Sequence, residues 1–342
     1  MSRFLDAARQ LPVDVTPIWL MRQAGRSLPE YRKLRERWSL VDIVAQPELC
    51  AEVTLQPVRR LGVDAAVMFA DIVLPLRGMG VEFELVENVG PVIAEPISGL
   101  AGIERLRVPA GEEAAPEVIK AVRQVVAESP VPVICFAGAP FTLASYLVEG
   151  RPSRDFAKVK ALMYSEPAAF DQLLRKLAAT MASYLEAQVA AGAAAIQLFD
   201  SWVGALALDD YEARVLPHTR SIFDALRPLG VPRIHFGTNT AGLLESIGSS
   251  GPDIISLDWR VQLDAAWDRV GRDRGVQGNL DPAVLLGPAG LVRHRARDVL
   301  RRAGGRPGHI FNLGHGVLPA TPLENLQLLV DTVHEWQVAR VA

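Results

Sequence analysis

The sequence predicts an α/β fold: a single-domain (β/α)8 barrel of the TIM type. Short apolar runs rich in β-formers alternate with longer amphipathic segments nearly from end to end, and eight such runs can be counted. Eight strands separated by helices favour a closed barrel over a doubly wound sheet. No linker rich in Pro, Gly and Ser divides the 342 residues, so we expect one domain over residues 1–342.

Each element follows from a local pattern. The predicted strands are residues 17–21, 63–70, 131–137, 193–199, 231–236, 253–257, 275–278 and 309–313, after an N-terminal extension. Amphipathic helical segments lie between them, among them residues 155–191 and 322–340. Residues 79–97 break this rhythm, because apolar and polar residues alternate there around Glu87 and Asn88. That alternation predicts a hairpin-like insertion after the second strand.

The composition argues against several classes of partner. The chain has 36 Lys and Arg against 39 Asp and Glu, a net charge of −3, which does not favour nucleic acid or anionic lipid. No apolar run reaches the ~20 residues that a membrane helix needs, and the N-terminus has no secretory signal. Cys50 and Cys135 are far apart and form no CxxC motif. We therefore expect a cytoplasmic protein without disulfides.

Polar residues follow the predicted strands, where a barrel of this type carries its chemistry. In chain order they are the segment 22–37, Asp71, the segment 138–150 with Tyr146, Asp200 and Ser201, Thr238-Asn239-Thr240, Asp258, Asn279 and Asp281, and His315. Segment 22–37 contains six basic and two acidic residues. Arg22 and Arg26 are placed to present two guanidinium groups to an anion, since Gly25 lets the backbone approach a ligand closely. Alternatively, these arginines belong to a solvated helix start.

The other mouth residues also have two interpretations. Asp71 and Ser201 could each cap a following helix, or face the mouth, where a carboxylate stabilises developing positive charge. Tyr146 could be a core residue of a helix that starts near Thr142. His315 stands between two glycines, which expose it and favour a functional role.

Several chemistries lack their motifs. No Lys follows a strand to form a Schiff base, and neither a GxGxxG after a strand nor a GxxxxGK[ST] occurs. The six His residues show no HExxH spacing. We expect an arginine-rich anion site with one acid and one histidine, and neither metal nor cofactor.

Seven motifs lie along nearly the whole chain. They are PIWLMRQAGRSLPEYR at 17–32, LQPVRRLGVDAAVMFADI at 55–72, CFAGAPFTLASYLVEG at 135–150, QLFDSWVG at 197–204, ISLDW at 255–259, QGNLDP at 277–282 and NLGHGVLP at 312–319. In residues and in order, they resemble the uroporphyrinogen decarboxylase family. The loop Thr238-Asn239-Thr240 departs from the pattern that many members show.

The resemblance implies a homodimeric enzyme that removes carbon dioxide from the four acetate side chains of uroporphyrinogen III. The product is coproporphyrinogen III, and no cofactor takes part. The motifs imply that Asp71 binds the pyrrole N–H groups and stabilises a cationic intermediate, with Arg22 beside it in the catalytic site. The implied substrate-binding residues are Arg22, Gln23, Ala24, Gly25, Arg26, Arg35, Asp71, Tyr146, Phe199, Ser201 and His315.

Two alternatives stay open. One is a methyltransferase of the same superfamily that acts on a corrinoid or a thiol. Such sites use zinc held by His and Cys, and neither Cys50 nor Cys135 lies in such an arrangement. The other is a non-catalytic tetrapyrrole carrier, against which the intact Asp71 and RQAGR motif argue.

Overall fold

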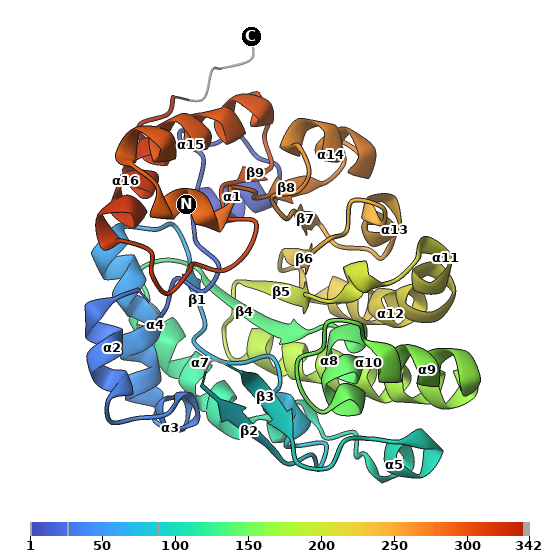
Figure 1. Ribbon diagram of the computed structural model, residues 1–342. Helices are drawn as coiled ribbons and strands as arrows, with labels where there is room; N and C mark the ends of the chain where they lie inside the picture. Colours follow the sequence, from blue (N-terminus) through green and yellow to red (C-terminus); the bar gives the residue numbers. More distant parts are fainter. Residues whose placement is uncertain (1, 26, 88, 338–342) are drawn as a thin grey trace.

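The computed structural model describes residues 2–25, 27–87 and 89–337. Seven parallel strands form one curled sheet in the order β1-β4-β5-β6-β7-β8-β9 (Figure 1). These strands are β1 Ala66–Val67, β4 Val133–Gly138, β5 Ala195–Asp200, β6 Arg233–Gly237, β7 Ile254–Ser256, β8 Gly275–Gln277 and β9 His309–Ile310. Helices cover the outside of this sheet, so the α/β architecture is the predicted one.

The first predicted strand, residues 17–21, is not a strand in the structure. Ile18 forms one isolated parallel bridge with Phe311, and the Asp64 N–H donates to the Ile18 carbonyl at 2.8 Å. The segment therefore spans the gap between β9 and the approach to β1. Side chains replace part of a regular ladder, because the Ile18 N–H donates to Oδ2 of Asp64 and the Met21 N–H to Oδ1 of Asn312. The ring closes without an eighth full strand.

Helices precede, connect and follow the strands, and most of them cover the outer side of the sheet. They are α1 Arg3–Ala8, α2 Pro29–Arg35, α3 Leu40–Val44, α4 Pro47–Leu61, α5 Gly99–Arg105, α6 Gly111–Ala114, α7 Pro116–Glu128, α8 Pro140–Glu149, α9 Ala157–Ser165, α10 Pro167–Ala190, α11 Leu208–Asp210, α12 Leu216–Leu226, α13 Leu244–Ser249, α14 Leu263–Val270, α15 Ala289–Ala303 and α16 Leu323–His334. In the described part of the chain, no helix is both long and apolar enough to cross a membrane.

Two predicted helical segments have different bounds. Residues 155–191 form α9 and α10 rather than one helix, because Pro167 follows Glu166, and proline disfavours the helical conformation of the residue before it. Glu166 accordingly has φ −131° and ψ 61°. The segment predicted over 322–340 is helical only as α16, and residues 338–342 lie outside the described residues.

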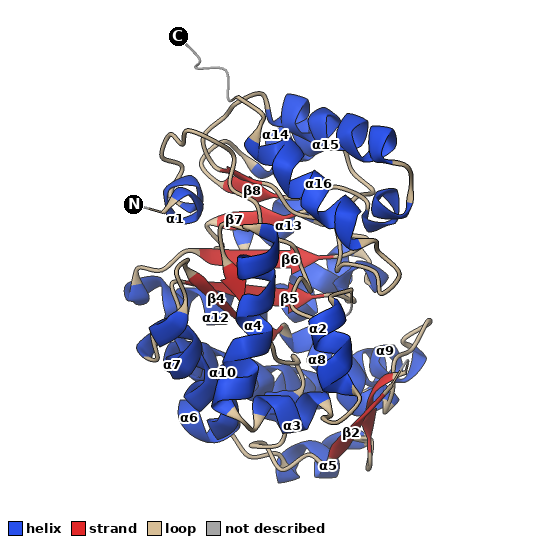
Figure 2. Cartoon of the chain, turned by 90° about the vertical axis from the view of Figure 1, so that its left-hand side faces the viewer, coloured by secondary structure: helices blue, strands red, loops and turns tan. Residues whose placement is uncertain are grey.

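The predicted insertion within residues 79–97 is confirmed as a hairpin. β2 (Phe83–Val86) and β3 (Gly90–Ile93) pair antiparallel, with Phe83 opposite Ile93. Both of these side chains are buried. Figure 2 shows β2 set apart from the strands of the main sheet. Asn88, one of the two predicted turn residues, lies outside the described residues.

Side chains fill the inside of the barrel. Trp19, Ile134, Ile234 and Phe236 belong to one buried cluster that also contains Phe4 of α1. The N-terminal extension thus covers the end of the barrel at which the strands begin. The indole N–H of Trp19 donates to Oε1 of Gln277 at 2.9 Å, so its buried polar atom is satisfied.

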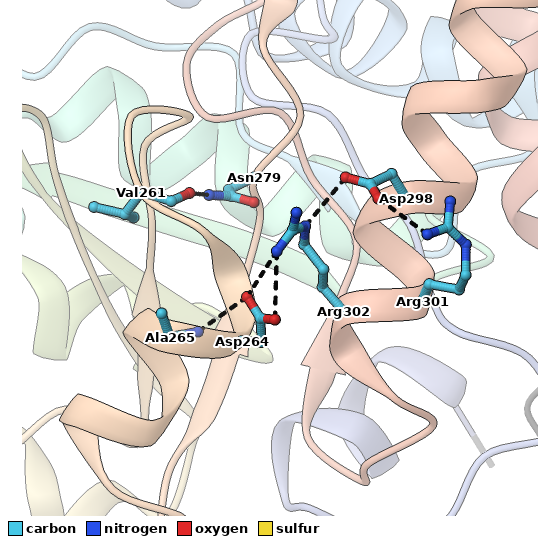
Figure 3. Close-up of polar contacts among 7 residues, drawn as sticks. All are labelled: Val261, Asp264, Ala265, Asn279, Asp298, Arg301 and Arg302. Carbon is cyan, nitrogen blue, oxygen red and sulfur yellow. Dashed lines mark hydrogen bonds and ion pairs between the residues drawn. The ribbon is translucent and has the colours of Figure 1, made fainter.

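Polar contacts fix the loops that follow β7 and β8. Asn279 Nδ2 donates to the carbonyls of Asp258 and Val261, each at 2.8 Å. Figure 3 shows the Val261 contact, and beside it Arg302 of α15, which bonds to Asp264 of α14 and to Asp298. The Asn279 bonds tie the two strand-end loops together, which positions the loop that contains Asp258.

Candidate active site

A cleft of about 270 Å³ opens at the carboxyl ends of the strands. Its wall takes residues from the first loop, α2 and α3, from β4 and α8, from the segments at and after the ends of β1 and β5, and from the loop after β9. The lining residues are Met21, Arg22, Ala24, Tyr31, Leu40, Val67, Met68, Phe69, Ala70, Asp71, Ile72, Phe136, Tyr146, Phe199, Ser201, Trp202 and His315. Residues from distant parts of the chain therefore meet where a barrel of this type places its chemistry.

The first loop is held in a constrained shape. Arg22 has φ 59°, a left-handed conformation that is uncommon outside glycine. The buried Gln23 side chain fixes the turn, because its Oε1 accepts from the Leu20 N–H at 2.8 Å and its Nε2 donates to the Ala65 carbonyl at 2.9 Å. Gly25 adopts φ 110°, and a Cβ there would lie 3.3 Å from the ring of Tyr31. The loop presents Arg22 and Ala24 to the cleft, while Gln23 supports it from behind.

Of the other two predicted arginines, the structure describes only Arg35. Arg26 lies outside the described residues. Arg35, at the end of α2, donates from Nη1 to the Trp38 carbonyl at 2.8 Å and lines none of the clefts described here. Its guanidinium therefore forms a hydrogen bond within its own segment of the chain.

Asp71 lies in the cleft, half-buried, after β1. Its Oδ1 accepts from the Val73 N–H at 3.1 Å, which fixes the direction of the carboxylate. The short helix η1 (Leu74–Leu76) begins after its N-cap residue Val73, and no side-chain hydrogen bond caps it at this residue. Asp71 therefore closes the turn that precedes η1 and also faces the cleft, so its two interpretations are compatible.

Tyr146 reaches the cleft from α8, which begins at Pro140, near the predicted start. Burial raises the pKa of Tyr146 above its ordinary value, and the Asp71 carboxylate adds to this, while Arg22 acts in the opposite direction. The hydroxyl therefore stays protonated at neutral pH and can donate a hydrogen bond. Its ring packs against Trp202, with ring centroids 4.1 Å apart.

Ser201 follows the end of β5 and lines the cleft without capping a helix. The short helix η2 (Val203–Ala205) has Trp202 at its N-cap and no side-chain capping bond. The neighbouring Asp200 is fully buried, and its Oδ1 accepts from the Thr142 hydroxyl at 2.8 Å. The Ser201 carbonyl accepts from the Thr238 hydroxyl. These bonds fix the backbone that carries the Ser201 side chain.

His315 enters the cleft from the loop after β9. Its Nδ1 accepts from the Gly316 N–H at 2.7 Å. An accepting Nδ1 carries no proton, so Nε2 carries it and serves as a donor. Phe236 and Trp259 stand edge-on to the imidazole, with centroids 6.1 and 6.4 Å away.

Aromatic rings form one side of the cleft. Phe199 stands edge-on to Phe136 at 5.3 Å and, outside the lining, to the fully buried Phe236 at 5.7 Å, and Tyr31 contacts Phe69 at 5.5 Å, measured between ring centroids. Of these rings, only Phe199 is predicted from the sequence, and Trp202 is not. Their one visible signal is that each stands near the end of an apolar run or next to a predicted polar residue.

A second cleft of about 450 Å³ adjoins the first and shares Ser201, Trp202 and His315 with it. It is further lined by Ser153, Arg154, Phe156, Gly204, Ala205, Thr238, Asn239, Trp259 and Arg260. A hollow of about 590 Å³ lies at the other end of the barrel, beside α1. There Arg233 is already paired with Asp253 at 2.8 Å. Because barrel enzymes place their chemistry at the carboxyl ends of the strands, we assign the first cleft, and not this hollow, to the site.

Possible metal ligands do not gather in the described ranges. Within residues 2–25, 27–87 and 89–337, no three His, Cys, Asp or Glu side chains come together in a way that could hold an ion. Cys50 and Cys135 are both buried and free.

Comparison with known proteins covers nearly the whole chain. The family model described as uroporphyrinogen decarboxylase (URO-D) matches residues 1–336. A uroporphyrinogen decarboxylase from Sorangium cellulosum is 55% identical over 335 residues, which are 97% of this chain and 96% of that protein. One from Thermus thermophilus is 55% identical over 331 residues, 97% of each chain. In fold, the chain is similar to a methyltransferase from Methanosarcina mazei, with a TM-score of 0.81 at 20% identity over 97% of each chain.

Proposed function

Because the chain belongs to the uroporphyrinogen decarboxylase family, we propose that its first cleft converts uroporphyrinogen III to coproporphyrinogen III. The enzyme is a carboxy-lyase of heme biosynthesis. The observation that carries the assignment of the site is the position of Asp71. Its carboxylate lies in a cleft with aromatic walls, together with Arg22 and the donors Tyr146 and His315.

The reaction needs an electron sink and a proton source. When the bond between an acetate methylene and its carboxylate breaks, carbon dioxide leaves and the bonding electrons stay on the methylene. Protonation of the adjacent pyrrole ring makes it cationic, so the ring can accept these electrons. A proton then adds to the methylene to give a methyl group, and the ring releases the proton that it had gained, so the neutral pyrrole is restored and the net change is uptake of one proton and loss of carbon dioxide. A residue that stabilises the cationic ring lowers the barrier of the bond-breaking step.

We assign the stabilisation of that cation to Asp71. A fixed carboxylate in a partly buried cleft attracts a nearby positive charge more strongly than it would in bulk solvent. By analogy with a single oxyanion donor, the effect on the barrier is about 3 kcal/mol. The bond from the Val73 N–H fixes the carboxylate before substrate arrives, so little reorganisation is required during the reaction. Asp71 also accepts from the pyrrole N–H groups in this proposal.

The donors around Asp71 hold the substrate's carboxylates. Arg22 supplies a charged fork at the exposed side of the cleft, and the hydroxyls of Tyr146 and Ser201 and Nε2–H of His315 supply neutral donors. Uniform binding of the ground state and the transition state would not raise turnover, so we assign these groups to orienting the ring. Phe199 packs against the macrocycle.

Assembly and location complete the proposal. We expect a homodimer in the cytoplasm that works without a metal or a prosthetic group. Light scattering measures the mass of the particle, which should be that of two chains. If no metal takes part, we expect activity to persist after dialysis against a chelator. Stoichiometric zinc, together with loss of activity on its removal, would contradict that expectation.

The direct test is product formation. The purified chain is incubated with uroporphyrinogen III without oxygen, and the porphyrins are separated after oxidation. We expect the tetracarboxylate product to accumulate and the octacarboxylate to disappear. Tight binding of the substrate without release of carbon dioxide would instead identify a tetrapyrrole carrier.

A further inference from the structure

We propose that the second cleft is an extension of the active site, in which Arg154 and Arg260 bind carboxylates of the substrate that are not removed. This inference rests on the function proposed above, because it assigns the far side of the same ligand. It also gives a role to the divergent loop Thr238-Asn239-Thr240, of which Thr238 and Asn239 line this cleft.

The first cleft is small for its ligand. Its volume of about 270 Å³ lies just below the range of pockets for drug-sized ligands, which span roughly 300 to 1,000 Å³. A tetrapyrrole with eight carboxylates exceeds an ordinary drug-sized ligand. Part of the macrocycle or its side chains must therefore extend beyond the first cleft, and the adjoining second cleft of about 450 Å³ offers the space.

Trp202 forms the boundary between the two clefts. Its ring contacts Tyr146 of the first cleft at 4.1 Å and Phe156 of the second cleft at 5.3 Å, measured between centroids. Ser201 and His315 line both clefts, so a carboxylate bound between them sits at the junction. One ligand can thus contact both clefts across a continuous aromatic and polar wall.

Contacts with Trp259 and Asp258 hold the Arg260 side chain in position. Its guanidinium lies over the Trp259 ring at 3.9 Å, and Nη1 donates to Oδ2 of Asp258 at 2.9 Å. Asp258 is 3% exposed and also accepts from the Arg260 N–H at 2.9 Å. The other guanidinium N–H groups have no hydrogen-bond partner among the described residues. An arginine fixed on one edge and open on the other can bind a carboxylate with little loss of side-chain entropy.

The divergent loop shares the same anchor. The Asn239 N–H donates to Oδ2 of Asp258 at 2.5 Å, and Asn239 has φ 58°, a conformation that asparagine tolerates better than most residues. A Cβ on Gly204 would lie 2.2 Å from the Thr238 carbonyl oxygen, so the loop packs directly on η2. Asp258 therefore fixes both Arg260 and Asn239, and the second cleft is preformed.

Arg154 supplies the second positive charge. It lies exposed between α8 and α9, and it has no hydrogen bond or ion pair within the described ranges. A hydrogen bond closes the turn that contains Arg154, because the Ser153 hydroxyl accepts from the Phe156 N–H at 3.1 Å. No Asp or Glu side chain is among the described residues that line the second cleft. Two guanidinium groups without an acid in the lining make this cleft suited to carboxylates.

The test compares Arg154→Ala, Arg260→Ala and the double variant with Arg293→Ala. Arg293 is exposed on α15 and lines none of the clefts described here, so it controls for the loss of one surface charge. We expect each single variant to raise KM about three- to tenfold and leave kcat within about twofold, because uniform binding is lost. The ionic-strength dependence of kcat/KM should weaken in the double variant.

Product inhibition provides the sharper readout. Coproporphyrinogen III retains the carboxylates assigned to the second cleft but has lost the acetates. The inhibition constant for this product should therefore rise by about the same factor as KM in each variant. Arg260→Lys should restore only part of the affinity, because lysine lacks the planar fork.

The outcomes separate the two proposals. If the unaltered chain decarboxylates and the double variant matches Arg293→Ala in KM and in product inhibition, the second cleft does not bind substrate, and the function stands. If the unaltered chain does not decarboxylate, the proposed function itself is wrong. Equal melting temperatures of all variants establish that a higher KM reflects binding and not unfolding.

Discussion

A Cβ atom on Gly316 would lie 2.4 Å from Cδ of Arg22 and 2.8 Å from its Cγ. These are atoms of the arginine stem, and Arg22 is itself held at φ 59° in a loop tied by Gln23. The stem therefore cannot move away without a change in the first loop. Gly316 thus leaves the space through which Arg22 reaches the cleft.

We predict that Gly316→Ala lowers kcat/KM by at least about tenfold, a change of about 1.4 kcal/mol, because Arg22 is displaced from the substrate's carboxylates. Steady-state kinetics measure this change. Gly290→Ala is the matched control, because a Cβ there meets nothing within 4 Å and Gly290 lies in α15. Activity of Gly316→Ala equal to that of the control would show that the position of Arg22 is not important for turnover.

Asp71→Asn tests the assignment of the electrostatic role. Asparagine has nearly the same size, and its side-chain oxygen can still accept from the Val73 N–H, so we expect the fold to persist. We predict a fall in kcat of about 10²- to 10³-fold with a much smaller change in KM, because the lost charge acts on the transition state.

Asp281→Asn is the control for this prediction. Asp281 also follows a strand and also accepts from a backbone N–H two residues on, that of Ala283 at 2.9 Å, but it lines none of the described clefts. It should keep full activity. Proportional losses of kcat and substrate affinity in Asp71→Asn would mean that Asp71 binds the ring without any preference for its cationic form.

The two cysteines should be inert in the folded chain. Burial raises the pKa of Cys50 to about 12, and burial also raises that of Cys135. At pH 8 the reactive thiolate of Cys50 is therefore about 1 part in 10⁴. We predict that a thiol reagent such as DTNB labels neither cysteine in the native protein and labels both in urea. Rapid labelling of the native protein would contradict the packing around Cys50.

The alternation of strands and helices was predictable because each element leaves a local pattern in the sequence. Residues 17–21 are the exception to this local pattern. They have the composition of a strand, but the acceptors for the Ile18 and Met21 N–H groups are side chains 46 and 291 residues away. No local pattern could show that these side chains replace the ladder.

The residues of the candidate site also fall into two groups, those that local sequence patterns predict and those that they do not. Asp71, Ser201 and His315 could be singled out because they follow strands, and all three line the first cleft. Trp202 and Arg260 could not be predicted from the sequence, because their roles depend on packing between loops that are distant in the sequence. Arg35 belongs to a basic segment, yet the direction of its side chain depends on how α2 ends, and the structure turns it to Trp38.

His309 should make the stability of the fold depend on pH. It is fully buried in β9, where burial lowers its pKa from 6.5 to about 4, although the hydrogen bond to the Gly278 carbonyl opposes this shift. The folded state therefore excludes a proton that the unfolded chain binds near its ordinary pKa. Above about pH 7 neither state binds this proton, so the group has no effect on stability there.

As the pH falls from about 6.5 towards 4, the unfolded state gains this proton first, so the free energy of unfolding decreases, by up to about 3 kcal/mol. Urea unfolding at pH 7.5, 6 and 5 measures the slope. His309→Gln retains a donor for the Gly278 carbonyl but cannot titrate, so its slope should be shallower than that of the unaltered chain. His294→Gln, at an exposed position on α15, should leave the slope unchanged. Parallel slopes for the unaltered chain and His309→Gln would mean that His309 titrates alike in both states.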